Sequence, residues 1–283
     1  KVILATGSIE RPMIFDCNDR PGIMLSSAVR KYINYYGIKC GNNVVIFTSN
    51  DDAYETAISL HSKGVTIEAI IDIREQSSGG LPKKCNELGI KILWKSAVVY
   101  AEGYKKINKI HAMKLTDDNR STIGNKLKIN CDLLCVSGGY TPAIHLFTQS
   151  GGKLEFNEKK HYFQPKLTAL NQISVGSCNG TFDLKNIIEE SQKKTNEFLK
   201  LNHGNQINIS EFNNGTIENI WLLPSDKISG KTKSFVDYQN DTTANDIKLA
   251  LREGYKSIEH VKRYTTTGMA TDQGKIGNMH ALG

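Results

Sequence analysis

Hydrophobic and polar positions follow one another along the chain in a pattern that predicts an α/β protein. The first residues, Lys1–Gly7, have the apolar character of a buried strand that ends in small residues. Apolar side chains then recur at helical spacing, which predicts an amphipathic helix closed by Gly37. The members of this apolar stripe are Leu25, Ala28, Val29, Tyr32, Ile33 and Tyr36.

A strand–helix–strand unit follows this helix. Val44–Thr48 is continuously apolar, Asp51–Lys63 has an apolar face at helical spacing, and Thr66–Ile73 is a second strand. This order predicts parallel pairing with a right-handed crossover. Ile90–Tyr100 and Ile107–Leu115 then predict antiparallel ribbons.

The second half of the chain repeats the strand and helix signals and then changes character. Cys131–Ser137 and Ile173–Val175 read as buried strands, and Leu184–Leu201 as a long helix. Short helices follow near the end of the chain. One of them is opened by a capping box made of Thr243 and Asp246.

Three of the predicted strands end in small residues, which marks them as candidates for ligand binding. In doubly wound sheets, small side chains at the carboxyl ends of strands let a dinucleotide lie against the backbone. The helix after Gly176 would direct free N–H groups toward a pyrophosphate. The candidate cofactor-binding residues are Ala5, Thr6, Gly7, Gly138, Gly139, Gly176 and Ser177. We nominate no catalytic residue and no metal ligand, because no such constellation stands out.

The order of these signals resembles flavoproteins with two dinucleotide-binding domains, in which the second domain is inserted into the first. The resemblance implies the C-terminal part of a doubly wound FAD/NAD(P)-binding domain at residues 1–40 and 131–224. It implies an inserted Rossmann-like domain at 41–130 and a small helical domain at 225–283. Because the family's first glycine fingerprint precedes the Ala-Thr-Gly strand, we expect an internal fragment of a longer protein.

The sequence departs from this family at three places. Thr48–Tyr54 replaces the glycine-rich turn of the inserted domain, so a pyrophosphate would not reach its backbone, and we interpret Asp72 as structural. Ser177 replaces the family's Asp that contacts the flavin's ribityl chain, which favours NAD over FAD in this chain. The six cysteines include no CxxC pair, which removes a disulfide-reductase mechanism.

Longer segments resemble the alpha subunit of heterotetrameric sarcosine oxidase. The most specific lie within residues 235–275 and read FVDYQNDTTANDI and TTTGMATDQGK, and residues 18–24 and 45–54 also match the family. The resemblance implies an oxidoreductase subunit that acts on CH–NH donors. Sarcosine would be oxidatively demethylated, oxygen reduced to peroxide, and the one-carbon unit passed to tetrahydrofolate. This chain would hold NAD without a catalytic role, scaffold the complex and be inactive alone.

The same resemblance implies partners and further cofactors. We expect beta, gamma and delta subunits, with FAD in the beta subunit and FMN at the alpha–beta boundary. Tetrahydrofolate would bind a C-terminal half that this chain lacks, and the complex would be cytoplasmic. Residues 225–283 also resemble the helical [2Fe-2S] module of bacterioferritin-associated ferredoxin, but no cysteine follows Cys178, so the module would carry no cluster. Lys262, Arg263 and Thr265–Thr267 would contact a phosphate such as that of FMN or face solvent.

Composition adds exclusions rather than a positive identification. The chain has 283 residues and a net charge of +7, from 36 basic and 29 acidic residues that are interleaved. Nucleic-acid binders more often show a stripe of one sign, so we expect no nucleic-acid partner. No apolar run reaches the roughly 18 residues of a membrane span, so we expect no membrane partner.

Two other functions stay open at this point. One is a self-sufficient NAD(P)H-dependent flavin (FAD) oxidoreductase, against which stand the missing glycine fingerprint and the missing cysteine pair. The other is a structural subunit that binds no nucleotide. The nucleotide content of the full-length protein would separate the three.

Overall fold

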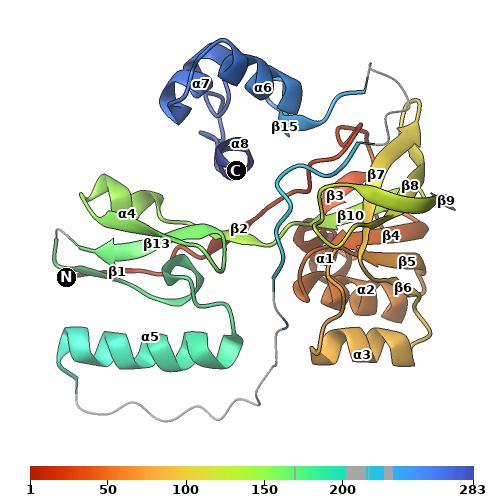
Figure 1. Ribbon diagram of the computed structural model, residues 1–283. Coiled ribbons are helices and arrows are strands. Elements are labelled where there is room, and N and C mark those ends of the chain that lie inside the picture. The colour runs from red at the N-terminus through yellow and green to blue at the C-terminus, as the bar shows by residue number, and fades with distance from the viewer. Residues whose placement is uncertain (169, 202–214, 216, 226–231) are drawn as a thin grey trace. The chain divides into compact units, whose positions relative to one another are not determined.

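The computed structural model describes residues 1–168, 170–201, 215, 217–225 and 232–283. They form two compact units (Figure 1). Unit 1 comprises Lys1–Ile9 and Tyr140–Asn214, and unit 2 comprises Glu10–Gly139 and Gly215–Gly283. We describe each unit by itself.

A parallel sheet of five strands forms the centre of unit 2. Its strands lie in the order β3, β10, β4, β5, β6 and all neighbours run parallel. The sheet consists of β3 (Ile23–Leu25), β10 (Leu133–Ser137), β4 (Asn43–Thr48), β5 (Thr66–Asp72) and β6 (Ile92–Leu93). The predicted strand–helix–strand unit is therefore confirmed, with β4 and β5 as its parallel strands.

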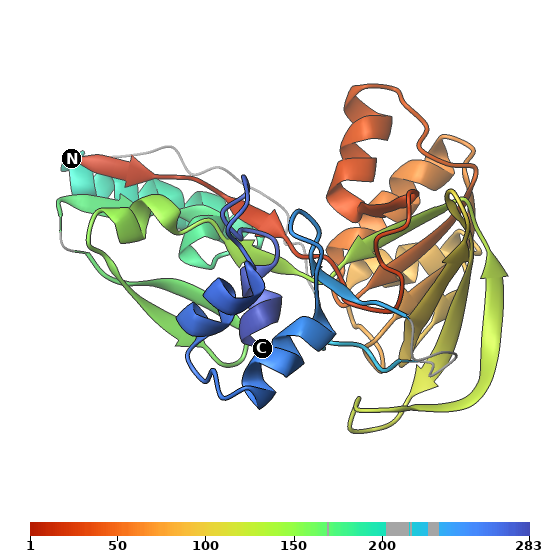
Figure 2. The ribbon, with the colours of Figure 1, turned by 90° about the horizontal axis from the view of Figure 1, so that it is seen from above.

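Both faces of this sheet are covered, so unit 2 has three layers (Figure 2). Val44 and Ile46 pack toward three helices, whereas Val45 and Phe47 pack toward an antiparallel sheet, as alternate side chains of a strand must. The helices are α1 (Ser26–Tyr35), α2 (Asp52–Ser62) and α3 (Gly80–Glu87). The antiparallel sheet consists of β7 (Ser96–Gly103), β8 (Ile107–Leu115) and β9 (Thr122–Asn130).

The segment that we expected to form one ribbon at Ile90–Tyr100 is divided. Its first part, β6, joins the parallel sheet, and β7 begins after Lys95, whose φ of +51° turns the chain. The prediction of antiparallel pairing between this segment and Ile107–Leu115 is confirmed for β7 and β8. The sequence pattern does not predict β9, because its residues are mostly polar and mostly exposed.

The pairing also joins segments that the three-domain division assigned to different domains. β10 pairs with β4 on one side and with β3 on the other, and α1 packs on the same sheet. By their contacts, residues 10–40 and 131–139 therefore belong to the same compact unit as residues 41–130. The division itself stays a prediction.

The C-terminal part of unit 2 consists of short elements, as predicted. They are β15 (Phe235–Asp237), β16 (Thr242–Thr243), α6 (Ala244–Arg252), α7 (Ile258–Thr265) and α8 (Asn278–Leu282). The capping box is confirmed, since Asp246 N donates to Thr243 Oγ1 at 3.3 Å and Thr243 N donates to Asp246 Oδ2 at 2.8 Å.

Buried polar residues in the loop after residue 10 hold this C-terminal part. The Asp16 carboxylate accepts hydrogen bonds from three hydroxyls, those of Ser225 at 2.5 Å, Thr232 at 2.9 Å and Ser234 at 2.8 Å. The Asn18 amide pairs with the backbone of Phe235 in the manner of a neighbouring strand, donating at 2.9 Å and accepting at 2.8 Å. The bonds to the Asp16 carboxylate are charge-assisted, and such bonds are stronger than those between neutral groups.

Unit 1 is built around two short parallel strands with a hairpin and a long helix. The parallel pair is β1 (Val2–Leu4) and β14 (Gln172–Ser174), and a second pair is β2 (Ser8–Glu10) and β11 (Tyr140–Pro142). The other elements are α4 (His145–Gln149), the hairpin β12 (Lys153–Asn157) and β13 (Tyr162–Leu167), the 3₁₀ helix η1 (Gly176–Asn179) and α5 (Leu184–Leu199). No residue of α5 is fully buried.

His280 in α8 gives unit 2 a pH-dependent stability. Its ring is 9% exposed and packs edge-on against Trp221, with the ring centroids 5.6 Å apart. Burial, with Arg11 as a smaller cause, lowers the pKa of His280 from 6.5 to about 4. The folded-state pKa therefore lies below the unfolded one, so the stability that neutral His280 contributes is present above pH 6.5 and lost as the pH falls toward 4.

We predict that replacing His280 with Phe weakens this acid sensitivity. Between pH 7.5 and 4.5 the wild type should lose up to about 3 kcal/mol of unfolding free energy through His280, and the His280→Phe variant should not. Urea unfolding followed by tryptophan fluorescence measures the difference. The matched control is His61→Phe, at an exposed position of α2. An equal acid loss in wild type and His280→Phe would contradict the assignment.

Candidate functional site

The loops after β1 and β14 lie side by side in unit 1. The strands are parallel neighbours in which Leu4 is opposite Ser174, and Val175 N donates to the carbonyl of Leu4 at 3.0 Å. The carboxyl ends of the two strands therefore meet at one edge of the sheet, where doubly wound folds bind ligands. The predicted residues that this edge brings together are Ala5, Thr6, Gly7, Gly176 and Ser177.

The backbone of these loops is open at Gly7, whereas Gly176 is buried. Gly7 has a φ of +76°, and a Cβ added to it would meet no atom within 4 Å. Gly176 has a φ of +73°, and its added Cβ would meet only Ile187, at 3.4 Å. The Gly7 loop is fixed from behind, because the Thr6 hydroxyl donates to Ala143 O at 2.7 Å and Ala143 N donates to Gly7 O at 2.9 Å.

The helix expected directly after Gly176 is arranged differently from the prediction. The one-turn helix η1 begins at Gly176 itself, and α5 begins only at Leu184. The side chain of Asp183 caps α5, accepting from Asn186 N at 3.0 Å. The N-terminus of α5 thus has one of its amides capped by a carboxylate of the chain itself, and the prediction that this helix points free N–H groups at a pyrophosphate stays a prediction.

Gly138 and Gly139 lie in unit 2 and pack against the chain's own residues. A Cβ at Gly138 would stand 2.4 Å from the carbonyl oxygen of Pro12. A Cβ at Gly139 would stand 3.0 Å from the Arg11 guanidinium and 3.1 Å from Ile217. Internal packing therefore accounts for both glycines, and their proposed contact with a nucleotide stays a prediction.

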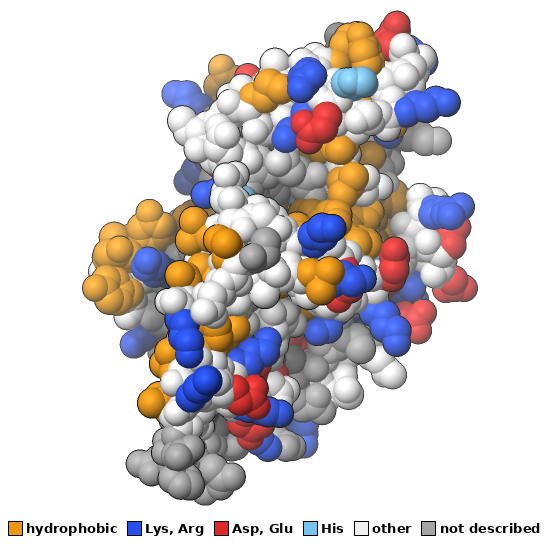
Figure 3. Space-filling model, turned by 90° about the vertical axis from the view of Figure 1, so that its left-hand side faces the viewer, with side chains coloured by type: hydrophobic (Ala, Val, Ile, Leu, Met, Phe, Trp, Pro, Cys, Tyr) orange, Lys and Arg blue, Asp and Glu red, His pale blue; other side chains and the backbone are white. Residues whose placement is uncertain are grey.

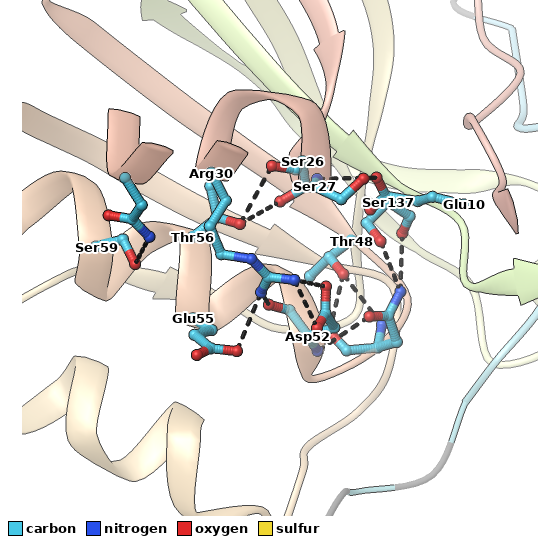
Figure 4. A network of polar contacts seen from close by, with 12 residues as sticks. Glu10, Ser26, Ser27, Arg30, Thr48, Asp52, Glu55, Thr56, Ser59 and Ser137 are labelled. Carbon is cyan, nitrogen blue, oxygen red and sulfur yellow. Dashed lines mark hydrogen bonds and ion pairs between the residues drawn. The ribbon is translucent and has the colours of Figure 1, made fainter. Parts of the chain in front are cut away.

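The carboxyl edge of the unit 2 sheet is closed by polar side chains in the turn between β4 and α2 (Figure 4). The Thr48 hydroxyl donates to the carbonyl of Asn50 at 2.9 Å. The Asn50 amide donates to the hydroxyl of Ser137, at the end of β10, at 3.0 Å, and accepts from Asp52 N at 3.0 Å. These side chains occupy the place where a glycine-rich turn would leave the backbone bare.

A second set of contacts ties α1 to the same turn (Figure 4). Arg30 holds Asp52 through two hydrogen bonds of 3.0 Å and Glu55 through one of 3.1 Å. The buried Glu10 carboxylate accepts from Ser27 at the N-terminus of α1, through the amide at 2.9 Å and the hydroxyl at 2.5 Å. Burial raises the pKa of Glu10, partly offset by its bonds to Ser27 and Ser137.

Asp72, the residue in the place of a ribose-binding acid, is fully buried at the end of β5. Arg74 donates to both of its oxygens, from Nε at 3.0 Å and from Nη2 at 2.6 Å, and the Tyr54 hydroxyl donates to it at 2.7 Å. Arg74 Nη2 also lies 2.7 Å from the Asp51 carboxylate. Burial, followed by the charge of Asp72, raises the pKa of Tyr54. These contacts agree with the structural interpretation of Asp72.

The chain also crosses this edge on its return to unit 2. Gly215 N donates to Asp51 at 2.8 Å, and Glu218 N donates to the carbonyl of Ser49 at 3.3 Å. A Cβ added at Gly79 would stand 1.8 Å from the Asp51 carboxylate. The edge of the unit 2 sheet is thus filled by its own residues and leaves a ribose no free acid to bind.

Apart from these two edges, the described part of the chain has hollows but no grouped metal ligands. Unit 1 has a hollow of about 610 Å³ whose lining includes residues of α4, β13, β14, η1 and α5, among them Ser174, Asn179 and Lys194, but not Ala5–Gly7. Among the residues that the structure describes, no three His, Cys, Asp or Glu side chains are grouped so that they could hold a metal ion. No described helix is long and apolar enough to cross a membrane.

The architecture of the chain is similar to that of two solved oxidoreductase structures. The solved structure of L-proline dehydrogenase from P. horikoshii matches 99% of this chain and 52% of its own, with a TM-score of 0.59 and 20% identity. Thioredoxin reductase from T. acidophilum matches 71% of this chain and 64% of its own, with a TM-score of 0.51 and 15% identity. At these identities the likeness concerns the fold alone.

Sequence relatives are more specific. The chain is 34% identical over 294 residues to the sarcosine oxidase alpha subunit of Corynebacterium sp. strain P-1, and 34% identical to that of Rhizobium meliloti. Residues 231–283 match the sarcosine oxidase A3 domain. The chain is thus homologous over its whole length to sarcosine oxidase alpha subunits, and it spans 30% and 28% of the length of these two relatives.

We predict that the ion cluster around Arg74 is required for the folding of unit 2. Replacing Arg74 with Ala leaves the buried Asp51 and Asp72 carboxylates without their cation, which should cost about 3–5 kcal/mol of unfolding free energy. Chemical denaturation followed by circular dichroism measures this loss. The control Arg120→Ala, at an exposed position, should change stability by less than about 0.5 kcal/mol. Equal stabilities of the two variants would contradict the role given to Arg74.

Proposed function

We propose that this chain is the nucleotide-holding and scaffolding part of the alpha subunit of a sarcosine oxidase-like complex. The complex would be an oxidoreductase acting on CH–NH donors: it would oxidatively demethylate sarcosine to glycine, reduce oxygen to hydrogen peroxide and pass the one-carbon unit to tetrahydrofolate. The homology to alpha subunits supports this assignment. The chain itself would bind NAD and contribute no catalytic group.

One observation carries the placement of the nucleotide. The two units each offer the carboxyl edge of a parallel sheet, and only that of unit 1 has bare backbone. At Gly7 an added Cβ would meet nothing within 4 Å, whereas the corresponding turn of unit 2 is filled by Thr48, Asn50 and Asp52. A dinucleotide needs close backbone approach, so Ala5–Gly7 and Gly176–Ser177 are the residues that would hold it.

The chemistry of these loops supports NAD rather than FAD. Neither Ala5–Gly7 nor Gly176–Ser177 contains a carboxylate, which in related flavoproteins accepts hydrogen bonds from the ribityl hydroxyls. The Ser177 hydroxyl, half-buried in η1, could bond to a ribose or phosphate oxygen but carries no charge. When bound here, NAD would serve as a structural ligand of unit 1. Gly138 and Gly139 would contribute only by shaping the neighbouring backbone.

The redox chemistry would lie with partner subunits. FAD would sit in a beta subunit and FMN at the alpha–beta boundary, with gamma and delta subunits completing a cytoplasmic complex, while tetrahydrofolate would bind a further part of the alpha subunit. The match of residues 231–283 to the sarcosine oxidase A3 domain supports membership of such an assembly.

The helical part of unit 2 would be a scaffold that resembles a [2Fe-2S] module and lacks its ligands. The Asp237 carboxylate accepts from Gly268 N at 2.7 Å, and the Thr271 hydroxyl donates to Gln239 at 2.7 Å. These hydrogen bonds join the β15–β16 turn to the loop after α7, and no cysteine occurs after Cys178. Side-chain bonds would thus do the joining that thiolates and a cluster do elsewhere.

The threonines proposed as phosphate contacts are engaged within the module. Thr265 Oγ1 donates to Val261 O at 2.7 Å, and Thr266 Oγ1 donates to Thr265 O at 2.6 Å. Their hydroxyls are thus used locally, which favours a surface role for this segment over a phosphate site. A flavin reductase remains the second candidate function, and it would require FAD in unit 1.

We predict that a methyl group at Gly7 reduces nucleotide binding. The Gly7→Ala variant of the full-length subunit should lose at least about tenfold in NAD affinity, because the added Cβ would enter the space of the ligand. The measurement is titration calorimetry after nucleotide removal, with mass identification of the nucleotide released from untreated protein.

The control for this prediction is Gly64→Ala in unit 2. Gly64 has a φ of +73° and an equally open Cβ position, so it carries the same backbone strain as Gly7 with its φ of +76°. Equal losses of affinity in both variants would mean that the effect comes from strain, and the proposed site would be wrong. Release of FAD alone from the wild-type subunit would instead favour the flavin reductase.

A further inference from the structure

An exposed aromatic patch lies at the C-terminal end of α1 in unit 2. We define the patch as Tyr32, Tyr35, Tyr36 and Ile38. Their exposed fractions are 40%, 77%, 55% and 50%. Tyr36 contacts both other rings, with centroids 5.9 Å from Tyr32 and 4.8 Å from Tyr35. Hydrophobic side chains also gather at the surface, with Lys or Arg beside them, on the face that Figure 3 shows.

The patch continues the apolar stripe by which α1 packs onto its own sheet. The sequence predicts one stripe that includes Val29, Ile33, Tyr32 and Tyr36, but only Val29 and Ile33 are buried in the structure. The stripe is therefore wider than the sheet and helices of unit 2 can cover. With 150–250 Å² per aromatic side chain, the three tyrosines leave on the order of 350 Å² exposed, which is the size of functional patches on soluble proteins.

The charged residues in the stretch of chain that carries the patch have one sign. Lys31 and Lys39 flank it, and no Asp or Glu occurs between residues 20 and 50. Both lysines are exposed, and neither has an ion-pair partner among the described residues. The nearest acids on the adjoining helix, Asp52 and Glu55, are already held by Arg30. Two copies of this surface would repel each other, so the charges favour an acidic partner over a second copy.

We propose that the patch is a docking site for another protein subunit of the assembly, one that presents an apolar surface with carboxylates at its rim. Tyrosines are enriched at the energetic centres of protein interfaces, where their rings are desolvated and their hydroxyls find partners. Tyr35 and Tyr36 would enter the apolar part of the partner, and Lys31 and Lys39 would pair with the carboxylates. The inference rests on the proposed function only in assuming a complex of several subunits.

Tyrosine labelling tests the proposal on the full-length subunit purified alone and in complex with its co-purifying subunits. Mass spectrometry after brief iodination should show Tyr35 and Tyr36 modified at least fivefold less in the complex. Tyr104, which is 92% exposed in the same unit, is the matched control and should be modified equally in both samples. Unchanged labelling of Tyr35 and Tyr36 would overturn the proposal, as would a subunit that is monomeric with no co-purifying partner.

Charge reversal tests the chemistry of the partner. The Lys31→Glu/Lys39→Glu variant should bind its partner subunits at least tenfold more weakly in sedimentation velocity, and added salt should weaken wild-type binding. The control Lys105→Glu/Lys106→Glu changes two exposed lysines beside Tyr104 and should bind normally. If Tyr35 and Tyr36 were protected because the subunit alone associates with itself, the proposal of an acidic partner subunit would be wrong. Nucleotide content, measured on the same samples, reports on the proposed function independently.

Discussion

The buried Arg74 side chain holds together the carboxyl edge of the unit 2 sheet. Its guanidinium joins the carboxylate of Asp51, in the turn between β4 and α2, to that of Asp72 at the end of β5. Ser77 and Gly215 complete the hydrogen bonds of Asp51, and Tyr54 completes those of Asp72. Buried charges are tolerated only when they are paired and hydrogen-bonded. The cluster meets this condition with groups of the protein alone, and so the edge has no need of a ligand.

Because the Arg74 cluster closes the edge of unit 2, the two units have different roles. The edge of unit 2 is rigid and closed, which suits a domain that supports other elements, and the loop at Asp16 and Asn18 carries the helical part in turn. The edge of unit 1 keeps bare backbone at Gly7. A fold that elsewhere binds two dinucleotides would here bind one, and its second sheet would serve as a scaffold for an assembly.

Much of the fold could be predicted from the sequence, because strong local patterns produced it. The continuous apolar run at β4, the helical stripe of α1 and the capping box at Thr243 each correspond to one element. The polar strand β9 could not be found, since its order comes from pairing with β8. The five predicted residues of unit 1 lie at one edge of the sheet because β1 and β14 pair in parallel, and their contact with a nucleotide stays a prediction. The Asp183 cap and the packing behind Gly138 were not foreseen, because each depends on contacts between residues far apart or on a side-chain conformation.

Hydrogen–deuterium exchange of the full-length subunit, with and without added NAD, tests the central claim most directly. If NAD binds the loops of unit 1, the backbone amides of residues 5–9 and 175–181 should exchange more slowly when NAD is present. Residues 48–54 and 72–77 should exchange at the same slow rate in both samples, because their own side chains already close that edge. Protection by NAD of residues 48–54 and 72–77, with residues 5–9 and 175–181 unchanged, would contradict it.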